Sequence, residues 1–288
     1  MLETPSVSGE TLTEESIAGS TRYPVMIIGG AEDKVNKCSI LKAFFGSAGG
    51  REARLGIIPT ASREPAAAGD RYYRIFSALG AAQVRVLDIR YRSECSEDRW
   101  INMLSECTGI FMTGGDQLRL RDVLGGTRLI DEIKTRLAKQ ALVIAGTSAG
   151  AAIMGEDMIA GGSSGESPNQ RLVDLTYGLG FVPELLVDQH FHNRNRMARL
   201  LSAIAAHPTR IGVGIDEDTC AAMVSDSVFQ VLGKGTITVV DPGSMTHNNY
   251  PSAEDSAPLS LHNLKVHVLN QGDRYDYKQR KVLQAQTT

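Results

Sequence analysis

Short apolar runs alternate with segments of helical spacing through the first half of the chain. A short, continuous apolar run is typical of a parallel strand that is buried on both faces. The runs are Pro24–Gly30, Leu55–Pro59, Val84–Ile89, Gly109–Met112 and Leu142–Ala145. The helical segments are Val35–Phe45, Tyr72–Leu79, Asp98–Leu104, Leu118–Leu124 and Ile130–Lys139. This alternation predicts a parallel sheet with helices on both faces.

The second half of the chain has a different pattern. It predicts a strand at Leu185–Asp188, a helix at about Asn195–Ala206 and a buried strand at Ile211–Ile215. Three short apolar segments then follow one another across turn residues, which is typical of an antiparallel meander. They are Ala221–Val224, Val228–Leu232 and Thr236–Val240, and a last strand is predicted at Leu264–Leu269. We therefore expect an α/β fold in which a mostly parallel sheet carries an antiparallel strand edge in its C-terminal half.

The polar ends of the chain set the expected domain boundaries. Residues 1–22 are polar, acidic and rich in Ser and Thr, and they lack the basic and apolar regions of a secretory signal. We expect a disordered leader over residues 1–22, a single α/β domain over 23–275 and a polar tail over 276–288.

The composition argues against several classes of protein. Lys and Arg number 30 against 33 Asp and Glu, and a net charge of -3 does not favour nucleic-acid binding. The chain has no apolar stretch of about 18 residues, so no membrane span is expected. The four cysteines are widely spaced without a C-x-x-C pair, which favours reduced thiols in a cytoplasmic protein over a metal or redox site. We expect no cofactor.

The segment Gly146–Gly150 fits the pattern G-x-S-x-G between a predicted strand and a predicted helix. A serine at such an elbow projects from the carboxyl edge of the sheet, and small neighbours let the backbone make the turn. Ser148 is therefore the candidate nucleophile, and the N–H of Ala149 is a candidate oxyanion donor. The alternative interpretation is an ordinary glycine-rich turn.

A second polar segment, Asp188–Arg199, follows the predicted strand at 185–188 and leads into a helix. A serine nucleophile needs a base, and His190 lies where the carboxyl edge of the sheet is expected. Three arginines at the helix start could bind carboxylates in a bidentate manner. They are Arg194, Arg196 and Arg199. The alternative for these arginines is a solvated basic helix face.

A third segment, Thr113–Gln117, also follows a predicted strand. The N–H of Gly115 is a candidate second oxyanion donor, and Gln117 is a candidate for hydrogen bonding to substrate. The alternative is a plain joint in which Asp116 caps the next helix. The earlier segment Gly29–Lys34 has a similar character, but it fits neither G-x-G-x-x-G nor a Walker motif, so nucleotide binding has little support.

Taken together, these motifs resemble those of the cyanophycinases, serine peptidases related to aspartyl dipeptidases and to class I glutamine amidotransferases. The resemblance covers roughly residues 23–269 and rests on G-G-D-Q, G-T-S-A-G-A and D-Q-H-F-x-x-R-x-R-x-x-R-L, in this order. It implies an amidotransferase-like fold and hydrolysis of cyanophycin, a poly-aspartate with arginine on each side chain, to β-Asp-Arg dipeptides. It implies Ser148 as nucleophile and His190 as general base. The pocket positions that it implies are Gln117, Asp188, Gln189, Arg194, Arg196 and Arg199.

The acid that orients the base has two candidates. Glu217 directly follows the buried strand Ile211–Ile215 and would lie at the edge that carries Ser148 if this strand joins the parallel sheet. The resemblance also favours Glu217, because the related dipeptidases look like Ser-His-Glu enzymes with the acid after the histidine. Glu166, in a Gly/Ser-rich loop, is the rival. Without a catalytic role, Glu217 is a loop cap and Glu166 a solvated charge.

Other functions remain open from the sequence. A dipeptidase for short Asp-X peptides is the nearest alternative to a cyanophycin hydrolase, and the arginine-rich helix start favours the polymer. A non-catalytic binding protein on the same fold is a different class, disfavoured because Ser148 and His190 are both present. We expect cyanophycin as the partner molecule and a homodimer as the assembly.

Overall fold

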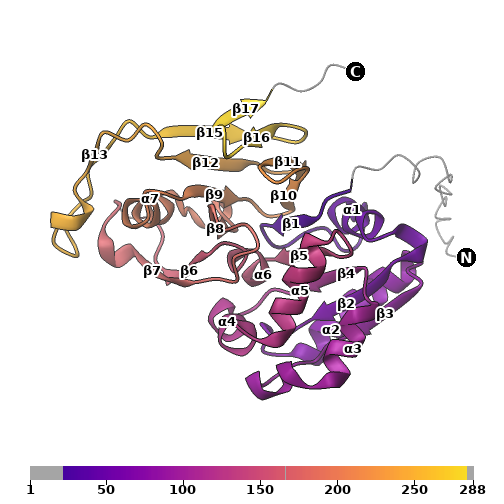
Figure 1. Ribbon diagram of the computed structural model, residues 1–288. Helices are drawn as coiled ribbons and strands as arrows, with labels where there is room; N and C mark the ends of the chain where they lie inside the picture. The colour runs from indigo at the N-terminus through magenta and orange to yellow at the C-terminus, as the bar shows by residue number, and fades with distance from the viewer. Residues whose placement is uncertain (1–21, 166, 284–288) are drawn as a thin grey trace, which may run out of the picture.

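The computed structural model describes residues 22–165 and 167–283 and contains a mixed sheet of nine strands (Figure 1). The strand order is β17-β16-β11-β10-β1-β5-β4-β2-β3. One half of the sheet is parallel and comprises β1 (Val25–Ile28), β2 (Arg54–Ile58), β3 (Gln83–Val86), β4 (Gly109–Met112) and β5 (Val143–Thr147). The other half is antiparallel and comprises β10 (Thr219–Met223), β11 (Val228–Gly233), β16 (Arg274–Asp276) and β17 (Lys281–Leu283). The predicted fold class is confirmed.

Helices cover both faces of the parallel half. Successive side chains of a strand point to opposite faces, so the neighbours Met26 and Ile27 of β1 lie in two separate apolar clusters. The Met26 cluster contains α1 (Ser39–Ser47) and α2 (Pro65–Ala78). The Ile27 cluster contains α3 (Asp98–Glu106), α4 (Gln117–Leu124) and α5 (Arg128–Ala138). The central strands β1, β4 and β5 are thereby buried on both faces, which is why they are mostly apolar, whereas the edge strand β3 is only half-buried.

A second sheet lies beside the first and is built from four strands of the C-terminal half of the chain (Figure 1). Its order is β15-β12-β9-β8, from β8 (Leu185–Gln189), β9 (Ile211–Ile215), β12 (Ile237–Asp241) and β15 (Lys265–Leu269). The helix α7 (Met197–Ala206) packs on one face through Leu200 and Ile204. The other face joins the Ile27 cluster through residues such as Val213 and Val239. The two sheets therefore share one core.

Smaller elements complete the described chain. They are α6 (Ala149–Ala152), the hairpin of β6 (Asp157–Gly162) and β7 (Val173–Tyr177), the pair β13 (His247–Asn248) and β14 (Leu261–His262), and the 3-10 turns η2 (Gly50–Glu52), η3 (Arg92–Ser96), η4 (Gln170–Leu172), η5 (His192–Arg194) and η6 (Tyr250–Ser252). Over residues 22–165 and 167–283, no helix has the length and apolar character that crossing a membrane requires. All four cysteines are free, and only Cys38 is partly exposed.

Three expectations need correction. The predicted meander is split, because β10 and β11 pair in the large sheet whereas β12 crosses to the second sheet and pairs with β9 and β15. The strand β9 does not join the large sheet; it lies parallel to β8 in the second one. The expected polar tail overlaps the fold, since β17 pairs with β16 beyond residue 275. The expected leader, Arg22 apart, and residues 284–288 lie outside the described residues.

Candidate active site

Ser148 occupies a strained turn between β5 and α6. Its backbone has φ 53° and ψ -110°, a conformation that L-residues seldom adopt outside functional sites. The glycines on either side are required by packing: a Cβ on Gly146 would lie 2.1 Å from the carbonyl oxygen of Gly150, and one on Gly150 would lie 2.5 Å from that of Met112. The pattern G-x-S-x-G is therefore an elbow in this fold, as the sequence predicts.

A chain of hydrogen bonds joins Ser148 to a histidine and a glutamate. Ser148 Oγ lies 2.9 Å from His190 Nε2, and His190 Nδ1 lies 2.6 Å from Glu217 Oε1. Because a carboxylate only accepts hydrogen bonds, Glu217 holds the proton of the imidazole on Nδ1 and leaves Nε2 free to accept from the serine hydroxyl. This is the arrangement of a nucleophile, a base and an orienting acid.

Two adjacent strand ends bring the base and the acid together. His190 directly follows β8, and Glu217 lies two residues beyond the end of β9. The strands are parallel and in register at Gln189 and Ile215, so both continue from the same edge of the second sheet. The predicted position of Glu217 at a shared carboxyl edge is thus met by β8 and β9, not by the large sheet that carries Ser148. The rival acid, Glu166, lies outside the described residues.

The surroundings of His190 lower the pKa of its imidazole below the ordinary value of histidine. Burial lowers the pKa of His190, the hydrogen bond that its Nδ1–H donates to Glu217 opposes this shift, and the charge of Arg194 adds to the lowering. A lowered pKa means that the neutral form, the one able to accept a proton, predominates above the ordinary imidazole range. The environment therefore suits a general base at neutral pH.

The remaining predicted residues beside Ser148 have distinct contacts. Gln189 Oε1 lies 3.3 Å from Ser148 Oγ as a second acceptor for the hydroxyl. Gln117 donates from Nε2 to the carbonyl oxygen of Ala160 at 2.7 Å, so its amide nitrogen joins α4 to β6. Gly115 has φ 147°, and a Cβ there would lie 2.0 Å from the carbonyl oxygen of Ala61. Ala149 begins α6 directly after the serine.

The neighbours of Gly115 agree with both interpretations of that segment. The side chain of Asp116 accepts hydrogen bonds from the N–H groups of Leu118 and Arg119, so it does cap α4. A Cβ on Gly114 would lie 3.1 Å from Ser148 Cβ, so the same loop also passes close to the elbow. The capping role and a position at the site coexist.

The three arginines divide into two groups. Arg196 and Arg199 are buried, at 7% and 4% exposure, whereas Arg194 is exposed. Both buried guanidinium groups form ion pairs with Asp188, itself 1% exposed: Arg199 Nε lies 2.8 Å from Oδ2 and Arg196 Nη1 lies 3.2 Å from Oδ1. Burial lowers the pKa of Arg196 to about 10, while Asp188 acts in the opposite direction.

This cluster corrects two interpretations of the sequence. A solvated basic face is wrong for Arg196 and Arg199, which lie beneath the surface and neutralise a buried carboxylate. The resemblance also implies that Asp188 is a pocket position that could pair with a guanidinium of the substrate, but its carboxylate is 1% exposed and already paired with both arginines. It organises the arginines instead. Among the described residues, Arg196 Nε remains a buried donor without a hydrogen-bond acceptor.

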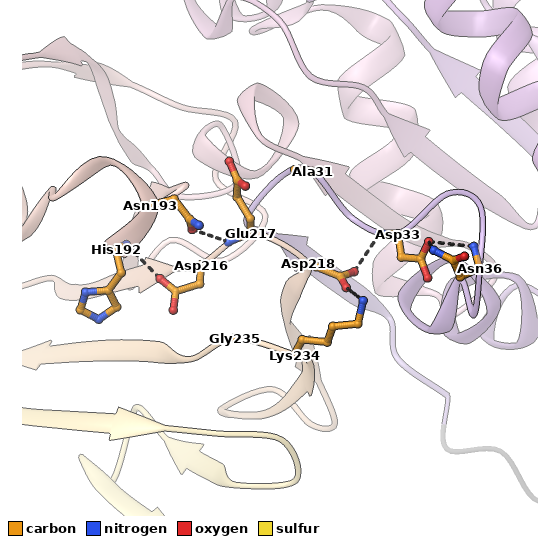
Figure 2. A pocket seen from close by; sticks show the side chains of 10 residues that line it. All are labelled: Ala31, Asp33, Asn36, His192, Asn193, Asp216, Glu217, Asp218, Lys234 and Gly235. Carbon is orange, nitrogen blue, oxygen red and sulfur yellow. Dashed lines mark hydrogen bonds and ion pairs between the residues drawn. The ribbon is translucent and has the colours of Figure 1, made fainter.

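A pocket of about 720 Å³ opens beside Glu217 (Figure 2). Figure 2 shows the side chains of Asp216, Glu217 and Asp218 pointing in three different directions from consecutive positions. Asp216 accepts from the N–H groups of His192 and Thr236, and Asp218 pairs with Lys234. The pocket is lined by Ala31, Asp33, Asn36, His192, Asn193, Asp216, Glu217, Asp218, Lys234 and Gly235. Of the three acids, Glu217 alone reaches His190, and the others stabilise the loops around it.

Sequence reasoning missed several residues that contact this site. Asn193 accepts the backbone N–H of Glu217 at 3.0 Å through Oδ1. Glu32 and Gly30, in the segment Gly29–Lys34, contact the elbow and the histidine ring. The sequence does show a Gly-Gly pair directly after a strand here, like the pair at 114–115. The sequence alone does not indicate which role these residues have in the site.

Comparisons with known proteins identify similar chains. The model of peptidase family S51 matches residues 25–232. The chain is 55% identical to the cyanophycinase of Trichormus variabilis over 266 residues, which cover 92% of this chain and 89% of that protein. It is 54% identical to the cyanophycinase of Geminocystis herdmanii over 257 residues, 89% of this chain and 94% of that protein.

A solved structure shows the same fold at much lower identity. The crystal structure of a peptidase from an acI-B1 actinobacterium aligns with a TM-score of 0.63 at 20% sequence identity. The alignment covers 90% of this chain and 98% of the other. At this identity the likeness concerns the fold alone.

Proposed function

The chain belongs to peptidase family S51, and from this premise we propose that it is a serine exopeptidase that hydrolyses cyanophycin, multi-L-arginyl-poly-L-aspartate, to β-Asp-Arg dipeptides. One observation carries the proposal: the hydrogen-bonded chain from Ser148 through His190 to Glu217. A protein that only bound a ligand would not need a strained serine aligned with a base and an acid.

The geometry supports acyl transfer in two steps. Ser148 Oγ attacks the scissile carbonyl carbon while His190 Nε2 takes the hydroxyl proton, and Glu217 stabilises the imidazolium that results. The N–H groups of Gly115 and Ala149 are the proposed donors to the oxyanion. The C–N bond then breaks, and His190 returns the proton to the leaving amine. In the second step His190 activates water, which hydrolyses the acyl-enzyme and regenerates the serine.

The substrate is inferred from the relatives and from the charge near the base. Proteins that are 50–55% identical over most of their length are cyanophycinases. Each unit of cyanophycin carries an arginine α-carboxylate, which a guanidinium can bind with two hydrogen bonds. Arg194 is exposed and close enough to His190 to affect its pKa. A cytoplasmic location and a homodimer remain predictions.

Purified cyanophycin provides the direct test of this function. We expect the enzyme to release β-Asp-Arg as the main soluble product, identified by liquid chromatography with mass spectrometry. Short Asp-X dipeptides, offered at the same concentration, should be hydrolysed much more slowly. Rapid hydrolysis of those dipeptides with intact cyanophycin would identify a dipeptidase, and no hydrolysis of either would leave only a binding protein.

Arg194 is the arginine we expect to contact a substrate carboxylate, because the other two are paired with Asp188. Arg194→Lys keeps the charge but loses the bidentate geometry. We expect kcat/KM on cyanophycin to fall by about 10- to 100-fold, which corresponds to about 1–3 kcal/mol for a hydrogen bond to a charged group.

Two controls separate recognition from general charge effects. Arg51→Lys changes an exposed arginine before the amino end of β2, whereas the proposed site lies at the carboxyl ends of the strands, and this variant should behave like wild type. Cyanophycin with amidated arginine carboxylates should be a poor substrate for wild type and should show little further loss with Arg194→Lys. If Arg194→Lys processes ordinary cyanophycin like wild type, Arg194 is a solvated charge.

A further inference from the structure

The segment Gly29–Lys34, between β1 and α1, has no part in the proposed chemistry, yet it contacts His190 and the residues next to Ser148 and Glu217. The carbonyl oxygen of Gly29 accepts the N–H of His190 at 2.8 Å, and that of Gly30 accepts the N–H of Asp218 at 2.9 Å. Just before the segment, the carbonyl oxygen of Ile28 accepts the N–H of Ser148 at 3.0 Å. The segment therefore lies where the ends of β5, β8 and β9 meet.

The closest of these contacts is between Gly30 and the imidazole ring of His190. A Cβ on Gly30 would lie 2.4 Å from Cε1 and 2.5 Å from Nε2 of His190, and Gly30 has φ +104°. The ring thus rests directly on the glycine backbone, and no side chain fits between them. The position of the base is set by this segment as well as by Glu217.

Glu32 makes the corresponding contact on the side of the nucleophile. Its carboxylate is 2% exposed and accepts the hydroxyl of Thr147 on Oε2 at 2.5 Å. The other oxygen, Oε1, accepts the hydroxyl of Tyr72 at 2.5 Å and pairs with Lys34 Nζ at 3.0 Å. A buried carboxylate requires such donors, and here one of them belongs to the residue directly before Ser148.

We propose that Glu32 is a positioning residue for the nucleophile and acts through Thr147; the inference rests on the proposed function. A left-handed φ at Ser148 persists only if the surroundings fix it, and α6, with four residues, is too short to do so alone. Thr147 is 3% exposed, so its hydroxyl finds its partner in Glu32 and not in water. The hydrogen bond fixes the last residue of β5, and with it the direction in which Ser148 Oγ leaves the backbone.

Thr147 offers a matched pair of substitutions. Thr147→Val keeps the shape and removes the hydroxyl, whereas Thr147→Ser keeps the hydroxyl and removes a methyl group. We expect Thr147→Val to lower kcat by about 10- to 100-fold with little change in KM, because a small displacement of a reacting group has effects of this size. Thr147→Ser should retain most of the activity. Glu32→Gln should resemble Thr147→Val, and the double variant should be little worse than either single one.

Stability must be separated from positioning. Thr127→Val removes another buried threonine hydroxyl, which donates to the carbonyl oxygen of Leu124 at 2.6 Å in the turn between α4 and α5. We expect it to lower the melting temperature without affecting kcat. The second readout is the rate at which a fluorophosphonate labels Ser148, located by peptide mass spectrometry, since labelling needs a competent serine but no cyanophycin.

The outcomes distinguish the inference from the function on which it rests. Slow labelling and low kcat in folded Thr147→Val, with recovery in Thr147→Ser, support positioning by Glu32. If Thr147→Val is labelled and turns over like wild type, Glu32 is a structural ion pair and the inference is wrong, while the labelled serine leaves the proposed function intact. If wild type is active but never labelled at Ser148, the serine mechanism fails and removes the inference with it. Should Glu32→Gln not fold, the two Thr147 variants decide.

Discussion

Ser148→Ala is expected to abolish nearly all release of β-Asp-Arg from cyanophycin while the protein keeps its fold. The substitution removes only Oγ, the atom that lies 2.9 Å from His190 Nε2 and 3.3 Å from Gln189 Oε1. Alanine retains the Cβ and adds no bulk to the elbow. Loss of the nucleophile of a serine protease has lowered kcat by about 10⁶, so residual turnover near the background rate is the expected result.

The measurement is dipeptide release per enzyme, together with the far-ultraviolet circular dichroism spectrum and the melting temperature. Ser105→Ala is the matched control, because Ser105 is an exposed serine on α3 that hydrogen-bonds only within its own helix. A serine-directed reagent should label wild type and Ser105→Ala but not Ser148→Ala. Turnover of Ser148→Ala close to wild type would rule out the serine mechanism.

Glu217→Gln is expected to lower kcat by about 10⁴, the loss seen when the acid of a serine protease triad is replaced by its amide. Glu217 Oε1 lies 2.6 Å from His190 Nδ1. A glutamine can present its N–H₂ group to Nδ1, which places the imidazole proton on Nε2, where it blocks acceptance from Ser148. KM should change little, because the substrate need not contact this carboxylate for binding.

The comparison with Glu166→Gln decides between the two acids predicted from the sequence. We expect Glu166→Gln to leave kcat unchanged, with at most a rise in KM. A large loss of kcat in Glu166→Gln alone would show that the glutamate in the Gly/Ser-rich loop is the acid. The two kcat values, measured over a pH range that covers the titration of His190, provide the evidence.

The three members of the proposed triad could be found from the sequence because each follows a strand that begins with a short apolar run and is buried along its length. β5, β8 and β9 are readable as buried runs, and a reactive side chain directly after such a run is placed by the fold at a strand end. Chemistry then limits the choice, since a serine at an elbow needs a histidine and a histidine needs an acid.

The division into two sheets could not be predicted in the same way. The apolar run Ile211–Ile215 would suit a buried strand in either sheet, so its pattern does not indicate which strand it pairs with. The pairing is decided by contacts between residues that are remote in sequence. A Cβ on Gly212 would collide with Leu200 and one on Gly214 with Phe191, so these glycines let α7 and the His190 loop pack against β9. The same holds for β12. It pairs with β9 and β15, which are remote in sequence, and not with its sequence neighbour β11.

The arginines show the limit of charge patterns. Arg196 and Arg199 lie close together in sequence, which is usual for a solvated helix surface. Their partner Asp188 precedes them on β8, eight and eleven residues earlier. Whether a cation is buried depends on whether such a carboxylate lies within reach, and only the folded chain shows that it does.

The members of the proposed triad come from two different sheets, so its alignment depends on how the sheets are placed relative to each other. Ser148 is carried by the nine-stranded sheet, whereas His190 and Glu217 follow strands of the four-stranded one. The hydrogen bond from the N–H of His190 to the carbonyl oxygen of Gly29 joins the two sheets. If one sheet were displaced against the other, the 2.9 Å contact between Ser148 and His190 would lengthen although the strand pairing within each sheet was kept. Under the proposed function, the rate of turnover therefore reports on how the two sheets are aligned. Substitutions in the core of either sheet are tolerated only if they preserve that alignment.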